Sequence, residues 1–366
     1  MRFVGLRDLF LPTLLALGAF APQRALAEPY FAVQEGLKCG ICHVNPTGGG
    51  MRTTFGQVWG QTALPAHRID TGDPTPWTGE INRFLAIGGN LRADADVTRI
   101  PNEKTQSDFA IEEMRVYLDA RVIPDRLSIY VDQRLAPGAS TTAEAYGRLW
   151  FGDQRYYIKA GQMFLPYGLR LQDDSAFVRQ VPGINFATPD QGVEFGFEGT
   201  AWGAELAVSN GAGGGPETDS GKQLSFRAER VTSRWRGGAS FNMNHTDVGD
   251  RRMQNIFAGL RTGPIAWLAE ADYIDDGSLD PRRKQWAGLI EANWKLLPGQ
   301  NLKLTAEVFD PDTDVREDQQ VRYSLVWEYV PIQFAQLRAG VRYYDGIPQN
   351  DRQNRQQLFL QLNGYF

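Results

Sequence analysis

The last nine residues read Leu358-Phe359-Leu360-Gln361-Leu362-Asn363-Gly364-Tyr365-Phe366. In an extended chain successive side chains point to opposite faces. Leu358, Leu360, Leu362 and Phe366 therefore share one face, whereas Gln361 and Asn363 lie on the other. Alternation with a period of two is typical of a β-strand with one apolar and one polar face. The stretch predicts such a strand at the end of the chain.

The same alternation recurs through residues 81–366, where turn signals separate about sixteen runs. Each run is as long as a tilted strand needs to cross a bilayer, or slightly longer. The predicted strands cover residues 84–97, 109–122, 126–136, 142–152, 156–167, 190–198, 202–210, 221–231, 234–245, 253–262, 265–275, 284–297, 301–310, 319–330, 335–345 and 355–366.

The connections between these runs alternate in length. Two-residue turns such as Pro124-Asp125 and Pro298-Gly299 separate longer loops such as 168–189 and 246–252. Short turns at one end and longer loops at the other are typical of bacterial outer-membrane barrels, and a terminal aromatic residue such as Phe366 agrees with that class. The sequence therefore predicts a mainly β fold: a porin-like antiparallel barrel of about 16 strands over residues 81–366, integral to the outer membrane and in contact with its lipid. A soluble propeller would show blade repeats, which are absent from the sequence.

The two faces of the predicted strands differ in chemistry. One carries aromatic residues for the interfacial girdles, and the other carries charges expected to line a polar lumen. The long loop 168–189, which contains Arg170, Asp173, Asp174 and Arg179, either folds inward as a constriction or stays at the surface. The girdle candidates are Tyr117, Trp150, Tyr156, Trp202, Trp235, Trp267, Trp286, Trp294, Trp327, Tyr329 and Tyr343, and the predicted lumen charges include Arg92, Arg115, Asp119, Arg121, Asp132, Arg134, Glu205, Arg227, Glu229, Glu307, Arg322 and Glu328.

Residues 1–27 have the features of an export signal. Arg2 and Arg7 precede an apolar run at 9–21, and Ala25-Leu26-Ala27 has the small-x-small pattern of a cleavage site. The apolar run is too short for a spanning helix, which needs about 20 residues. We expect a signal peptide over residues 1–27 and a mature chain that begins at Glu28.

The stretch Cys39-Gly40-Ile41-Cys42-His43 follows soon after the expected cleavage site. C-x-x-C-H is the attachment signature of haem c: two thioether bonds at Cys39 and Cys42, and His43 as the proximal iron ligand. These are the only two cysteines in the chain. A disulfide or a redox pair is the competing interpretation. Zinc needs about four ligands, and this region offers too few. We predict one covalently bound haem c.

Residues 28–80 form the predicted haem segment. A glycine-rich loop at 45–50 precedes a short helix in which Phe55 and Trp59 are placed to cover a haem face. Met51 and His67 are the candidates for the sixth iron ligand, and His245, another group or an open position remain as alternatives. About 50 residues cannot build much of a core. We therefore expect this segment to enter the barrel from the periplasmic side and plug it.

This order of signal peptide, single haem motif, glycine-rich segment and barrel resembles the fused outer-membrane monohaem cytochrome–porins. The best known members are iron oxidases of iron-oxidising bacteria. The motif resemblance covers Pro29-Tyr30-Phe31-Ala32, the stretch from Cys39 to His43, Pro46 and Phe55-Gly56. Several of the iron oxidases carry Leu-Thr and Gly-Arg-x-Phe elements where this chain has three glycines and Gly56-Gln57-Val58-Trp59. That departure leaves electron transport as the expected function and bears only on whether iron is the electron donor.

The resemblance implies electron transfer across the outer membrane by a single haem c. The implied partners are a periplasmic c-type cytochrome and an extracellular donor or acceptor, for which Fe(II) is a candidate. Two alternatives remain: a solute porin whose haem segment is a gate or plug, and a haem enzyme acting on a peroxide-type ligand. The net charge of −5 gives no electrostatic case for nucleic acid.

Overall fold

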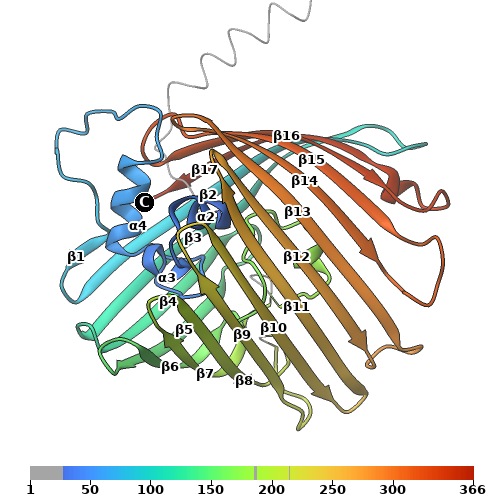
Figure 1. The fold of residues 1–366 in the computed structure, drawn as a ribbon, viewed down its shortest axis with the longest axis horizontal. Coiled ribbons are helices and arrows are strands. Elements are labelled where there is room, and N and C mark those ends of the chain that lie inside the picture. The colour runs from blue at the N-terminus through green and yellow to red at the C-terminus, as the bar shows by residue number, and fades with distance from the viewer. Residues whose placement is uncertain (1–27, 185–187, 214) are drawn as a thin grey trace, which may run out of the picture.

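The computed structural model describes residues 28–184, 188–213 and 215–366. The predicted signal peptide lies outside the described residues. Sixteen antiparallel strands, β2 to β17, wind into one closed barrel (Figure 1). β17 pairs with β2 and closes the barrel, with Leu362 opposite Ala93. The strands are Leu85–Arg99 (β2), Gln106–Ile123 (β3), Leu127–Ala136 (β4), Thr141–Phe151 (β5), Tyr156–Met163 (β6), Asp190–Glu198 (β7), Trp202–Ser209 (β8), Gln223–Val231 (β9), Trp235–Thr246 (β10), Gly249–Thr262 (β11), Ile265–Asp276 (β12), Arg283–Leu297 (β13), Gln300–Asp310 (β14), Gln320–Tyr329 (β15), Ala335–Asp345 (β16) and Gln356–Tyr365 (β17).

The predicted fold and strand number are confirmed, and two boundaries are corrected. β6 ends at Met163 rather than at residue 167, because the chain leaves the wall before Pro166 and turns into the lumen. β10 and β11 continue to Thr246 and from Gly249, so the predicted loop at 246–252 is a two-residue turn. A three-residue strand, β1 (Glu80–Asn82), pairs with the start of β2.

The wall has an apolar outer face and a charged inner face. Trp202, Trp235 and Tyr343 are exposed on the outside, whereas Asp132 and Arg227 are among the buried charges that point inward. Such a distribution suits lipid outside and a polar interior. Two predicted girdle residues are corrected. Tyr117 is buried and donates a hydrogen bond to Asn90, and Trp150 shares the inward parity of Tyr146 and Arg148.

The connection between β6 and β7 folds into the lumen, as one of the two sequence readings predicted. We call residues 164–184 of it the inward loop. A short helix, α5 (Phe177–Gln180), lies within it. The Phe177 amide donates to the Glu307 carboxylate at 2.7 Å, and the Leu169 amide donates to Glu270 at 3.0 Å. Asp173 pairs with Arg322 at 3.0 Å. The inward loop is therefore bound to the opposite wall.

Three helices precede the barrel: α2 (Pro29–Glu35), α3 (Cys39–Cys42) and α4 (Thr54–Thr62). Figure 1 shows them gathered at the end of the barrel where β2 begins. The amides of Ala66 and His67 donate to carbonyls in the β15–β16 turn at 2.8 and 3.0 Å. The segment thus lies at the end of the barrel that carries the short turns.

Among the described residues, no helix combines the length and the apolar character needed to cross a membrane.

Candidate functional site

Inward-facing charges of the wall hold the start of α2. The Glu28 carboxylate lies 2.8 Å from the Lys303 ammonium and 3.4 Å from the Arg338 guanidinium. The Tyr30 hydroxyl donates to Glu328 at 2.7 Å. All five side chains are buried. Because a buried charge is costly unless it is paired, these contacts fix α2 against β14, β15 and β16.

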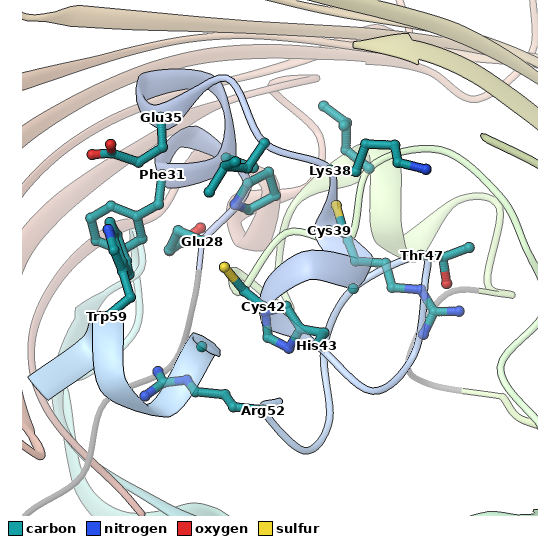
Figure 2. Close-up of a pocket in the computed structure, with 18 of the residues that line it drawn as sticks. Glu28, Phe31, Glu35, Lys38, Cys39, Cys42, His43, Thr47, Arg52 and Trp59 are labelled. Atoms are coloured by element: carbon teal, nitrogen blue, oxygen red, sulfur yellow. The ribbon is translucent and has the colours of Figure 1, made fainter. Parts of the chain in front are cut away.

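The motif residues 39–42 form α3, a single helical turn. The His43 amide closes this turn by donating to the carbonyl of Cys39 at 2.9 Å. Lys38, just before the turn, pairs with Glu198 at the end of β7. The spacing Cys-x-x-Cys on one turn places both thiols on the same side of the helix (Figure 2).

The glycine-rich loop after the motif is fixed from both sides. Residues 48–50 all have positive φ angles, of 97°, 75° and 64°, a region that glycine adopts without steric cost. A Cβ on the last of them would lie 2.6 Å from the Tyr130 hydroxyl. That hydroxyl accepts the Met51 amide at 3.0 Å, and Asn45 donates to Glu144 at 3.2 Å. The loop needs glycines because the wall approaches its backbone closely.

Helix α4 packs directly on the motif. Thr53 caps it, since its hydroxyl accepts the Gly56 amide at 3.1 Å. A Cβ at Gly56 would overlap the carbonyl oxygen of Cys42, so this close approach requires glycine. The helix turns Trp59 toward the motif, whereas Phe55 is exposed and lies outside the cavity lining. The prediction that both aromatic residues cover a haem face is therefore corrected for Phe55.

Cys39, Cys42 and His43 line one cavity with about 720 Å³ of space between its atoms. Figure 2 shows both sulfur atoms and the His43 ring facing the space between α2, α3 and α4. We call it the haem cavity, after the haem c that the sequence predicts at its motif residues. Its other lining residues include Glu28, Pro29, Phe31, Ala32, Glu35, Thr47, Arg52, Trp59, Leu64, Leu169, Arg170 and Arg227.

The donor set in the haem cavity fits a haem c. Nδ1 of His43 is buried and has no hydrogen-bond partner in the described part of the chain. Burial, reinforced by Arg52, lowers the pKa of His43 to about 3, against the opposing effect of the adjacent backbone of Gly50 and Gly49. The imidazole is therefore neutral near pH 7, the form that binds metal. Arg52, Arg170 and Arg227 supply positive charge for carboxylates such as haem propionates.

The thiols do not have the character of a redox pair. Both cysteines are free, and no disulfide joins them. Burial raises the pKa of the Cys42 thiol to about 11. Redox-active C-x-x-C pairs depend instead on a lowered thiol pKa. The alternative reading of Cys39 and Cys42 as a redox pair is thereby weakened.

The three candidates for the sixth iron ligand lie away from the haem cavity. Met51 is buried in an apolar cluster with Tyr117 and Tyr130. His67 is exposed beside the β15–β16 turn. His245 is exposed on β10 and contacts Asp250 at 2.6 Å. Among the described residues that line the cavity, His43 is the only histidine, and there is no methionine.

A second and larger cavity, with about 1400 Å³ of space between its atoms, lies beside the inward loop. We call it the outer chamber. Two exposed residues lie at its rim: Glu112 in the outer part of β3, and Pro137 directly after β4. His43, Arg52 and Arg170 line both this chamber and the haem cavity. The two spaces therefore meet at the predicted haem ligand, which the motif alone could not reveal.

Solved structures with the same architecture are outer-membrane proteins. An anion-selective porin of Comamonas acidovorans superposes with a TM-score of 0.62 at 8% identity, covering 77% of this chain and 99% of that chain. OmpT of Vibrio cholerae gives 0.59 at 12% identity, with 78% and 99% covered. OprB of Pseudomonas putida gives 0.61 at 8% identity, with 78% and 94% covered. The chain has the fold of an outer-membrane porin.

With its closed wall and apolar outer face, the porin-like chain is an integral outer-membrane β-barrel. Its short turns then face the periplasm and its longer loops face the outside. No family model matches the chain, and no curated protein sequence matches it. The matching structures cover about three quarters of the chain at low identity, so they show the fold alone. The chemistry of the site is argued from its own residues.

Proposed function

We propose that this porin-like barrel carries one covalently attached haem c and passes single electrons across the outer membrane. Cys39 and Cys42 hold the haem, and His43 is its proximal ligand. The group supplies reversible one-electron chemistry when bound. The protein encloses it between α2, α4 and the inward loop. The observation that carries this proposal is that all three motif residues line one cavity inside the barrel.

The positions of the two cavities support a route with an entrance at each end. Glu35 is exposed and lines the haem cavity on the periplasmic side, where we propose that a c-type cytochrome exchanges electrons. The outer chamber extends from His43 toward the extracellular loops. A bilayer core is about 30 Å thick, and a chamber that admits the outer donor shortens the distance that the electron must travel. Fe(II) is the candidate donor.

The family resemblance supports the same function. The cytochrome–porins combine a single C-x-x-C-H motif with a barrel, and here Gly56, one of the matching residues, is required by the packing of α4 on Cys42. The resemblance therefore includes a residue whose role in forming the site is structural and visible. The N-terminal segment acts as a plug in this proposal, held by buried pairs such as Glu28 with Lys303.

A second candidate function follows from the lining of the haem cavity. Since His43 is its only histidine among the described residues and Met51 packs elsewhere, an open sixth position would bind small ligands such as peroxide. Cyanide binding to the oxidised holoprotein distinguishes the two. An electron conduit with a filled sixth position binds cyanide slowly, whereas an open site binds it at once and shows a high-spin spectrum.

An optical redox titration of the purified holoprotein tests the proposal. We expect a covalent haem spectrum that Fe(II) converts reversibly from oxidised to reduced, and no passage of uncharged sugars through the reconstituted barrel. Absence of covalent haem would contradict the proposal as a whole. Haem that Fe(II) cannot reduce at any pH would contradict iron as the donor. Rapid sugar flux would favour a solute porin.

A further inference from the structure

The outer chamber is lined by an excess of positive charge. Six guanidinium groups line it with three carboxylates, those of Glu112, Glu113 and Asp174, and Arg115 also pairs with Asp132 at 3.0 Å, which leaves a balance of two positive charges. The predicted haem ligand His43 forms part of the same lining. The guanidinium groups belong to Arg52, Arg92, Arg115, Arg134, Arg170 and Arg179.

Two of the three carboxylates pair with arginines of the chamber and neutralise part of its positive charge. Asp174 pairs with both Arg92 and Arg179. Glu113 pairs with Arg115 at 3.0 Å. Arg134 is half-buried, and in the described residues it forms no ion pair with a carboxylate. Its Nε is buried without a hydrogen-bond partner. The charge of Arg134 is thus available to an incoming ligand.

We propose that the outer chamber is an anion site that selects reductants of net negative charge and delivers them to the haem cavity. A cleft of one sign, walled by low-dielectric protein, concentrates ions of the opposite sign and excludes those of its own sign. Hydrated Fe²⁺ is disfavoured there. A ferrous complex of a polycarboxylate fits the charge of the chamber, and guanidinium groups bind carboxylates bidentately.

This inference rests on the proposed function, because it names the class of donor that serves the same haem. In the transfer the ferrous chelate gives up one electron to the oxidised haem and becomes ferric. No bond forms or breaks, and no proton moves. The ferric chelate is less negative than the ferrous one by one charge, so the chamber also holds the product less tightly.

Stopped-flow reduction of the holoprotein tests the selection. The donors are Fe(II)–EDTA, which is anionic, and hexaammineruthenium(II), which is cationic. We expect the anionic donor to react faster at low ionic strength and to slow as salt is added. Arg134→Gln should lower its rate about threefold to tenfold and leave the cationic donor as fast or faster. Arg316→Gln, which removes an equal charge from an exposed outer loop, should change neither rate. A faster cationic donor in the unaltered protein, or equal effects of the two substitutions, would overturn the inference.

Binding of Co(III)–EDTA to the oxidised protein, measured by calorimetry, separates the two proposals because it requires no electron transfer. Binding that weakens in Arg134→Gln but not in Arg316→Gln supports the anion site, even if neither donor reduces the haem; the proposed function would then fail alone. Reduction by both donors without charge preference, together with no binding, would remove the anion site and leave the proposed function standing.

Discussion

The barrel wall and the N-terminal segment are stabilised in different ways. Each wall strand has 8 to 18 residues and is hydrogen-bonded to a neighbour along both edges. The three helices of the segment have 7, 4 and 9 residues, shorter than the roughly 12–15 at which an isolated helix becomes stable in water. Wall arginines supply donors to its backbone, Arg148 to Val44 and Arg261 to Gln34. We therefore expect the wall to form without the segment, and the segment to depend on the wall.

The largest expected effect is the loss of haem attachment while the barrel wall still assembles. Replacing Cys39 and Cys42 by serine removes both attachment points, so all covalent haem should be lost. The wall should still assemble, because none of its strand pairing involves these residues. Haem staining of a denaturing gel measures the first effect, and the heat-dependent gel mobility of outer-membrane fractions measures the second.

The matched control for the cysteine pair is Ile41→Ala, which lies within the motif, is exposed and keeps both thiols and His43. It should retain stained haem. A barrel that fails to assemble in the double serine variant, while Ile41→Ala assembles, would show that the wall depends on the segment. That result would contradict the expected independence of the wall.

The second prediction disturbs the packing within the segment. Gly56→Ala places a Cβ against the Cys42 carbonyl. Overpacking of this kind costs about 1–3 kcal/mol, so α4 should move away from α3 and the haem environment should loosen. Circular dichroism of the haem band on heating should show a lower midpoint. Gly147→Ala on β5 is the control, since its Cβ would meet nothing within 4 Å. Equal midpoints in both variants would contradict the close packing.

The wall could be predicted almost completely from sequence, because a period of two and the turn residues are local signals. The predicted strand boundary was wrong at the end of β6, where the chain leaves the wall. Phe164 and Leu165 continue the apolar character of β6 but are buried in the lumen, since the inward loop and the segment provide an apolar surface there. Tyr117 is on the inner face for the same reason. A lumen that contains protein accepts aromatic residues that an open pore would not.

Only the part of the site that belongs to the C-x-x-C-H motif could be predicted from the sequence. Cys39, Cys42 and His43 line one cavity, and their roles in holding a haem stay a prediction. Glu28 and Leu169 reach the same cavity from distant parts of the chain, and no local pattern marks them. Strand alternation placed Arg227 in the lumen but did not place it at this cavity. Phe55 and Trp59 lie one turn apart on the same face of α4, so helix periodicity could not tell them apart. These contacts arise from the closure of the barrel around the segment.

The third prediction weakens one contact between segment and wall. Tyr30→Phe removes the hydrogen bond to Glu328 and leaves a buried carboxylate with one donor fewer, at a cost of about 1–2 kcal/mol. The segment should then become more sensitive to limited proteolysis, while the wall strands stay resistant. Tyr329→Phe is the control, because Tyr329 lies beside Glu328 on β15 but faces outward. Unchanged proteolysis in Tyr30→Phe would mean that the ionic contacts of Glu28 suffice to hold α2.

The smallest expected effect concerns the residue on which sequence and structure differ most. Met51 was a candidate for the sixth iron ligand, yet its side chain packs against the wall cluster of Tyr117, Tyr130 and Tyr146. Met51→Leu conserves volume and should cost less than about 1.5 kcal/mol. The absorption spectrum of the haem, and its reduction potential, should stay as they are, and His67→Ala should likewise change neither. A spectrum that loses thioether ligation in Met51→Leu would show that Met51 leaves the wall when haem binds. The segment would then be shaped by its cofactor as well as by the barrel. The Met51 amide would have to leave the Tyr130 hydroxyl that now accepts it, and the glycine loop at 48–50 beside Tyr130 would have to move with it.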